Sequence, residues 1–140
     1  MSGKREKSCG AVVYTELDGD IGYVIVCSHT GVYGFPKGHV ERFETEYETA
    51  LREIKEETGL TVEIIPGFVS DVSYELPGKA GVIKHVRYFA AVYSGQTIRY
   101  QEEELTGAWV MPFDEAMKKL KFDSLKQVLS SADAFIRQHR

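Results

Sequence analysis

Three glutamates stand close together in one short stretch of the chain. Glu53, Glu56 and Glu57 are spaced i, i+3 and i+4, so on a helix their carboxylates project from one face. Like charges at this spacing repel one another, and a solvated helix face tolerates that repulsion. A bound cation would remove it, because carboxylate oxygens are the ligands that hard cations such as Mg²⁺ prefer. The spacing alone therefore leaves two interpretations, a solvated face or a metal site.

The segment before the glutamates supplies a second chemical feature. Residues 28–43 contain several breakers of regular structure: Gly31, Gly34, Pro36 and Gly38. Such a segment predicts a loop that lets its backbone approach a ligand closely. Lys37, beside Gly38, would add an ammonium group at the same place. A metal held by carboxylates, together with a cationic loop, is one way for an acidic protein to bind a polyphosphate.

These groups need a helix to position them, and residues 45–58 predict one. The less polar residues of this segment recur at i, i+3, i+4, i+7 and i+11, on one side of a helix: Tyr47, Ala50, Leu51, Ile54 and Thr58. Thr45 and Glu48 have the spacing of a capping box, and Gly59 stands where a left-handed C-terminal cap belongs. The glutamates fall on the side opposite the less polar residues.

The elements around this helix are mixed in type. Segments rich in β-branched and aromatic residues predict strands over 8–14, 23–27, 60–65, 68–76, 86–93 and 108–111, with a hairpin at 18–22 and Pro66-Gly67 separating two strands. Amphipathic spacing predicts two further helices, over 114–120 and 123–138. This order favours an α+β fold or an α/β/α sandwich over a regular βαβ repeat, and no linker divides residues 1–140.

Composition limits the function classes. The 140 residues, 43% of them hydrophobic, suffice for one globular domain with a single sizeable core. Lys and Arg number 17 against 21 Asp and Glu, a net charge of −4, which disfavours broad contact with nucleic acid or a membrane surface. No apolar stretch has the length of a signal peptide or membrane span, and Cys9 and Cys27 lie in predicted strands. We expect a cytoplasmic protein whose two cysteines are small buried hydrophobes.

The whole stretch from the loop to the helix resembles the signature of the Nudix hydrolase family. Gly38, Glu44 and the run Arg52-Glu53-Ile54-Lys55-Glu56-Glu57-Thr58-Gly59-Leu60 match every fixed position of the Nudix box. The resemblance implies an α/β/α sandwich around a mixed sheet, and cleavage of a nucleoside diphosphate linked to another group, with water and divalent metal. It implies that Glu53, Glu56 and Glu57 ligate Mg²⁺ or Mn²⁺, two or more ions with substrate, that the Gly38 carbonyl adds a ligand, and that Glu44 pairs with Arg52.

Weaker features resemble the subgroup of asymmetrical diadenosine tetraphosphate hydrolases, which produce ATP and AMP. They are the run Phe35–Glu41, residues 63–68, Tyr74, Trp109 and Glu115-Ala116. The resemblance implies Glu103 as a metal ligand or general base, in a register left open by its neighbours Glu102 and Glu104. It also implies substrate contacts from Lys37, Tyr74 and Lys84, with His39 and Lys79 as lesser candidates. Where animal members carry a base-stacking tyrosine, this chain has Gly107, so stacking would fall to Tyr33, Tyr74, Phe35 or another aromatic residue.

Other functions within and beyond this family stay open. Nucleoside triphosphates, RNA 5′ ends and diphosphoinositol polyphosphates are alternative substrates, the last two disfavoured by the net charge of −4. A non-catalytic domain that senses a nucleotide is a further alternative, although such domains usually carry a degraded box. The partner expected in every case is a small nucleotide or a related phosphate compound, and the sequence does not give the oligomeric state.

Overall fold

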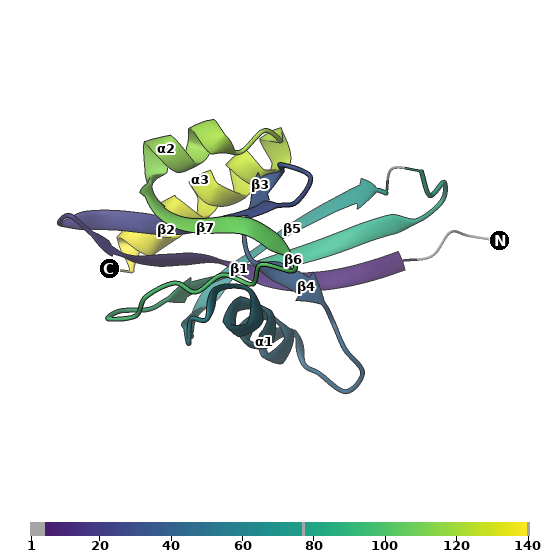
Figure 1. Cartoon of the computed structure of the whole chain (residues 1–140), viewed down its shortest axis with the longest axis horizontal. Helices are drawn as coiled ribbons and strands as arrows, with labels where there is room; N and C mark the ends of the chain where they lie inside the picture. Colours follow the sequence, from purple (N-terminus) through teal and green to yellow (C-terminus); the bar gives the residue numbers. More distant parts are fainter. Residues whose placement is uncertain (1–4, 77, 140) are drawn as a thin grey trace.

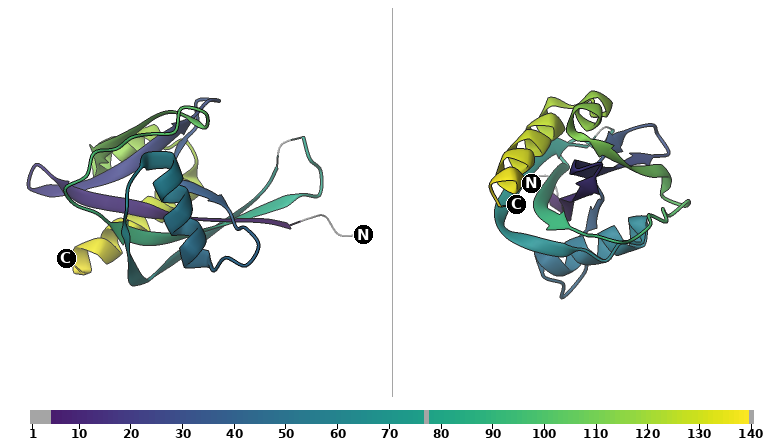
Figure 2. Two further views of the ribbon diagram at one scale, coloured as in Figure 1. Left: turned by 60° about the horizontal axis from the view of Figure 1, so that its bottom comes forward. Right: turned by 90° about the vertical axis from the view of Figure 1, so that its left-hand side faces the viewer.

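The computed structural model of the chain describes residues 5–76 and 78–139. A mixed sheet lies between helix α1 (Glu46–Thr58) on one face and helices α2 (Phe113–Lys119) and α3 (Asp123–Gln138) on the other (Figure 1). The two further views in Figure 2 show the same three layers. The predicted α+β fold, an α/β/α sandwich around a mixed sheet, is confirmed.

Seven strands are found within the described residues. They are β1 (Arg5–Leu17), β2 (Asp20–Ser28), β3 (Tyr33–Gly34), β4 (Lys37–His39), β5 (Glu63–Glu75), β6 (Ile83–Val92) and β7 (Leu105–Pro112). The main path runs β3-β2-β1-β6-β5, while β4 pairs with β1 and β7 pairs with β2. The β1–β6 pair is parallel and the other pairs are antiparallel. Strand β1 therefore joins both halves of the sheet and also receives the short strand β4 that precedes α1.

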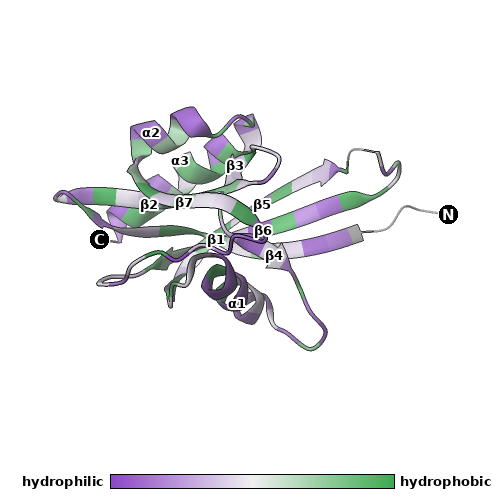
Figure 3. Cartoon of the chain, viewed as in Figure 1, coloured by the Kyte–Doolittle hydropathy of each residue, from purple (hydrophilic) through white to green (hydrophobic). Residues whose placement is uncertain are grey.

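Alternation along β1 divides the apolar residues between two cores. Val12 belongs to the core under α2 and α3, whereas Cys9, Ala11 and Val13 belong to the core under α1. Ile54 of α1 is fully buried in the second core. Figure 3 shows the hydrophobic residues concentrated in the sheet and on the inner sides of the helices. Both free cysteines are buried, as expected for small apolar side chains.

Helix α1 begins and ends as its sequence predicts. The Thr45 hydroxyl accepts the N–H of Glu48 at 3.1 Å, and the Glu48 carboxylate accepts the N–H of Thr45 at 2.8 Å, which completes the capping box. Gly59 has a left-handed φ of 77° and donates its N–H to the Lys55 carbonyl. The predicted inner side was partly wrong, because Tyr47 and Leu51 are 44% and 38% exposed and Thr49 is buried instead.

Three predictions about element boundaries were wrong. Strand β5 runs through Pro66-Gly67, because an edge strand does not need the missing proline N–H, and the pairing with β6 shifts register between Ile65 and Ser70. Residues 60–62, predicted as the start of that strand, lie before it. The loop predicted over 28–43 contains β3 and β4, because β3 pairs with β2 and β4 pairs with β1.

Among the described residues, none of the helices has the length and apolar character to cross a membrane.

Candidate active site

Strand β4 and helix α1 bring the glycine and the first glutamate of the motif into contact. Gly38 pairs with Cys9 of β1, which fixes the β4 backbone against the sheet. A Cβ atom at position 38 would overlap the carboxylate of Glu53. A side chain at position 38 would thus displace the Glu53 carboxylate from its present place, and the glycine keeps that carboxylate against the β4 backbone.

Glu57 and Lys37 form the most enclosed charged part of the site. Burial and the neighbouring Glu53 carboxylate raise the pKa of Glu57 to about 8, against the opposing effect of Lys37. Burial and the charge of Lys84 lower the pKa of the Lys37 ammonium. Two carboxyl groups thus interact unfavourably here with partial compensation from one lysine, and a cation is the kind of ligand that would relieve this repulsion.

Arg52 of the same helix binds the carboxylates of Glu44, Glu53 and Glu56. Its Nε donates to Glu44 Oε2 at 2.6 Å and its Nη2 to Glu44 Oε1 at 3.0 Å, a bidentate pair. Its Nη1 lies 2.7 Å from Glu53 Oε2 and 3.2 Å from Glu56 Oε2. The pairing of Glu44 with Arg52 expected from the sequence is present, and it extends to two of the three motif glutamates.

The same arginine also fixes the loop between β4 and α1. Arg52 Nη2 donates to the His39 carbonyl at 3.0 Å, and Glu44 Oε1 accepts the Glu41 N–H and the Thr49 hydroxyl, each at 2.9 Å. Hydrogen bonds from Arg52 and Glu41 lower the pKa of Glu44 to about 2. Loop and helix are therefore joined through a carboxylate that stays ionised over the physiological range.

Within residues 5–76 and 78–139, no three His, Cys, Asp or Glu side chains have their donor atoms gathered as a metal ion requires. At the motif helix, the carboxylates of Glu53 and Glu56 instead pair with the guanidinium of Arg52. A metal bound by these glutamates would compete with the guanidinium for the same oxygens.

A cavity of about 970 Å³ opens beside these carboxylates and collects most of the predicted site residues. Gly38 and all three glutamates of the motif line it, and so do the predicted substrate contacts Tyr33, Lys37, His39, Tyr74 and Lys84. Tyr74 and Lys84 are cross-strand partners in the β5–β6 pair, which explains their proximity. The lining thus combines carboxylates, two ammonium groups and aromatic rings.

Two predicted contacts lie elsewhere. Glu103 is exposed and is not among the residues that line the cavity, whereas its neighbour Glu104 is. The hydrogen bond from the Gln101 N–H to the Glu57 carbonyl, at 3.0 Å, places this turn beside the end of α1. Lys79, a lesser candidate, is exposed on the β5–β6 turn and does not line the cavity.

The cavity also contains apolar residues that sequence reasoning missed. Val32, Phe122 and Leu125 line it, and Phe122 is 55% exposed. Phe122 stands alone between two helices and belongs to no motif, so only the packing of α3 against the sheet brings it here. The space at Gly107 is taken by Trp109, whose ring would overlap a Cβ there and whose centroid lies 5.8 Å from that of Tyr33.

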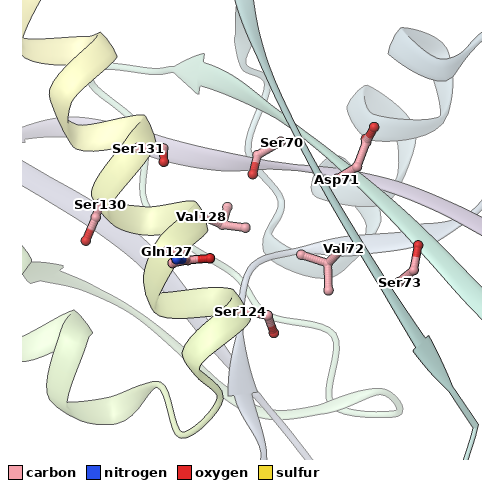
Figure 4. A pocket seen from close by; sticks show the side chains of 9 residues that line it. All are labelled: Ser70, Asp71, Val72, Ser73, Ser124, Gln127, Val128, Ser130 and Ser131. Atoms are coloured by element: carbon pink, nitrogen blue, oxygen red, sulfur yellow. The ribbon is translucent and has the colours of Figure 1, made fainter.

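A second cleft, of about 630 Å³, lies between β5 and α3 (Figure 4). Serine hydroxyls from both elements dominate its lining: Ser70, Ser73, Ser124, Ser130 and Ser131. Asp71 is the charged residue at this cleft, and Arg87 neutralises it through a bidentate pair at 2.8 and 2.9 Å. Because no lysine or arginine is among the described residues lining it, this cleft lacks the charges needed to hold a polyphosphate.

The family model of the NUDIX domain matches residues 4–131, and the chain belongs to the Nudix hydrolase family. Among curated proteins, the asymmetrical bis(5′-nucleosyl)-tetraphosphatase of Mus musculus is 29% identical to this chain, over 93% of this chain and 95% of its own length. A crystal structure of a C. elegans Ap4A hydrolase binary complex superposes with a TM-score of 0.86 at 26% identity, covering 95% of this chain and 98% of that one. An 8-oxo-(d)GTP phosphatase of Mycolicibacterium smegmatis is 34% identical over 69% of this chain and 29% of its own.

Proposed function

We propose that this Nudix hydrolase splits diadenosine tetraphosphate, or a related dinucleoside polyphosphate, into ATP and AMP. The observation that carries the proposal is the composition of the 970 Å³ cavity, where the motif carboxylates, two lysines and several aromatic rings share one lining. Carboxylates and lysines suit a metal-bound polyphosphate, and aromatic rings suit a nucleobase. The similarity to tetraphosphatases over nearly the whole chain supports the same substrate.

Divalent metal, Mg²⁺ or Mn²⁺, fits the donors at the motif helix. Glu53, Glu56 and Glu57 would hold it together with the Gly38 carbonyl, because Glu53 lies against Gly38 and a bound cation would favour the ionised form of Glu57, whose pKa burial and Glu53 raise. Bound metal supplies an activated water and neutralises the phosphate oxygens. Glu103 was the glutamate proposed from sequence as a further ligand or base; Glu104, on the same turn, has the better position because it lines the cavity.

The remaining residues of the cavity would orient the substrate. Lys37 and Lys84 would bind phosphate oxygens, and His39 would add a further polar group to the lining. Tyr33, Tyr74 or Phe122 would stack on one nucleobase in place of the aromatic residue missing at Gly107. Arg52 and Glu44 would act indirectly, by fixing the loop that presents Gly38.

A nucleoside triphosphate is the second candidate substrate. It is favoured by the 34% identity to an 8-oxo-(d)GTP phosphatase, the higher identity of the two, although that match covers 69% of this chain. The two candidates differ in size, because a dinucleoside tetraphosphate carries a second nucleoside that a triphosphate lacks.

The test is a comparison of substrates at equal concentration with Mg²⁺, with products separated by anion-exchange chromatography. We expect diadenosine tetraphosphate to give ATP and AMP in equal amounts, and metal chelation to abolish the reaction. Formation of two ADP would show the wrong bond cleaved. Faster turnover of 8-oxo-dGTP or dGTP would replace the first candidate with the second, and tight nucleotide binding without hydrolysis at any divalent metal would indicate a sensing domain.

A further inference from the structure

The loop between β4 and α1 contains a residue in an unfavourable backbone conformation. Phe43 has a φ of +72°, in the left-handed region that non-glycine residues seldom adopt. The Glu44 N–H donates to the Glu41 carbonyl at 3.0 Å, so residues 41–44 form a turn with Phe43 at its third position. Turns with a positive φ at this position strongly prefer glycine, because a side chain there is strained.

Among residues 5–76 and 78–139, no packing explains the phenylalanine. Phe43 is 92% exposed, the highest value among the large hydrophobic residues of these ranges. One described neighbour is the guanidinium of Arg42, which lies 5.1 Å from the ring centroid. The chain thus carries backbone strain and an exposed aromatic ring at a position where glycine would relieve both. Strain of this kind is a reason to look for a role outside folding.

The loop lies next to the proposed active site and is held there. Its residues His39 and Glu41 line the 970 Å³ cavity. Arg52 contacts the same two residues, through the His39 carbonyl at 3.0 Å and the Glu41 carboxylate at 3.3 Å, and also binds Glu53 and Glu56. Phe43 and Arg42 therefore follow directly after two cavity-lining residues, in a loop that Arg52 joins to the motif carboxylates.

We propose that Phe43, with Arg42 against it, forms a stacking surface for the second nucleobase of a dinucleoside polyphosphate. This inference rests on the function proposed above. In this proposal, one nucleoside and the phosphates lie in the cavity, and the second nucleoside lies beyond the motif glutamates, beside the turn of residues 41–44. An exposed aromatic ring and a guanidinium both stack on a purine, whatever its identity. Phe43 then selects for substrates with two bases.

Two substrates with the same number of phosphates test this selection. Diadenosine tetraphosphate carries two bases and adenosine 5′-tetraphosphate carries one, so the ratio of their kcat/KM values isolates the second base. We expect Phe43→Gly to lower this ratio about tenfold, through a higher KM for the two-base compound, in keeping with loss of one stacked base. Phe43→Tyr keeps an aromatic ring and should keep the ratio of the unsubstituted protein.

Asp18→Gly is the matched control. Asp18 also has a positive φ, 52°, but lies in the β1–β2 hairpin away from the cavity lining. Both glycine variants relieve left-handed strain, so neither should lower the Tm, and only Phe43→Gly should change the substrate ratio. A lower Tm for Phe43→Gly would reveal a packing role and overturn the premise.

The outcomes separate the two proposals. If the unsubstituted protein hydrolyses neither tetraphosphate, the proposed function is wrong. If it hydrolyses both, and Phe43→Gly leaves the ratio unchanged or slows both substrates equally, the proposed function stands and the stacking role of Phe43 is wrong.

Discussion

Two arginines each bind several carboxylates around helix α1, in different surroundings. Arg52 of α1 contacts Glu44, Glu53 and Glu56, and its side chain is 24% exposed. Arg87 of β6 contacts Asp71 of β5 and Glu46 in the first turn of α1, and its side chain is 36% exposed. Lys7 also pairs with Glu46. Both arginines make a bidentate pair with one carboxylate, so the two networks use the same chemistry.

The networks differ in what their carboxylates can do besides pairing. Glu53 and Glu56 line the cavity with Gly38, whereas Glu46 does not, and Asp71 lines the serine-rich cleft beside α3. The Arg52 network thus connects residues with a proposed role in metal binding, and the Arg87 network connects α1 to the sheet. The two networks therefore make the same kind of ion pair, and their expected roles differ because Glu53 and Glu56, bound by Arg52, line the cavity and Glu46, bound by Arg87, does not.

The largest difference between the networks should follow from removing one carboxylate charge in each. We expect Glu56→Gln to lower kcat by at least about 100-fold, because loss of a residue that only orients a metal ligand already costs up to about 100-fold. Glu46→Gln, the same change on the same helix, should leave kcat/KM within about twofold of the unsubstituted protein. Steady-state kinetics with Mg²⁺ measure both, and circular dichroism checks the fold. Full activity of Glu56→Gln would refute its role in metal binding.

Conservative substitution of the arginines should give the next largest difference. Lysine keeps the charge but loses the planar fork, so Arg52→Lys can no longer hold Glu44 at two oxygens while contacting Glu53. We expect kcat/KM to fall about 10- to 100-fold, as for residues that orient metal ligands. Arg87→Lys should change kcat/KM less than about twofold, because the pairs that it weakens lie outside the cavity. Equal losses in both variants would contradict the comparison.

Of the Arg52 network, the pair with Glu44 was predicted from the resemblance to the Nudix box, whereas the contacts with Glu53 and Glu56 were not. Glu44, Arg52 and Glu53 lie within ten residues, so the pair joins parts of one local segment. The Arg87 network was not predicted. Its members come from β5, β6 and α1, and only the register Asp71↔Arg87 brings the first two together.

Long-range contacts also set positions at the site that the sequence pattern does not give. Phe122 reaches the cavity through the packing of α3, and among the glutamates whose register the sequence left open, Glu104 lines the cavity on the turn that meets the end of α1. The strain at Phe43 comes from its positive φ, and a phenylalanine in a loop sequence does not predict a positive φ. Long-range packing and backbone geometry decide these positions.

Acid should weaken both networks by the same mechanism. Arg52 holds the pKa of Glu44 down to about 2, and Arg87 lowers the pKa of Asp71, with Lys7 and Arg87 lowering that of Glu46. A carboxyl group with a depressed pKa contributes stability that is complete above its ordinary value, near 4.5, and lost as the pH falls through the folded value. We expect the free energy of unfolding to fall between pH 4.5 and pH 2, less steeply in Arg52→Met and in Arg87→Met.

Urea titrations at several pH values in this range, without added metal, measure these slopes. Lys55→Met is the control, because Lys55 is a cation of α1 whose described hydrogen bonds go to the Gly59 carbonyl and the Thr61 hydroxyl. It should keep the slope of the unsubstituted protein. An unchanged slope in both arginine variants would show that these carboxylates titrate at ordinary pKa values.

The smallest effect should be the net stability that Arg87 contributes. The Arg87 side chain is 36% exposed and that of Asp71 54%, so solvent screens the pair, and exposed pairs contribute at most about 1 kcal/mol. We expect Arg87→Met to lower the Tm by about 3 °C for a chain of this size and to leave kcat/KM unchanged within error. A double-mutant cycle with Asp71→Asn should give a coupling energy of about 0.5 kcal/mol, since bidentate geometry favours the pair while solvent weakens it. A coupling energy near zero would mean that the Arg87–Asp71 pair fixes the position of α1 without stabilising the fold. A loss of activity in Arg87→Met would mean that the position of Glu46 matters to the active site.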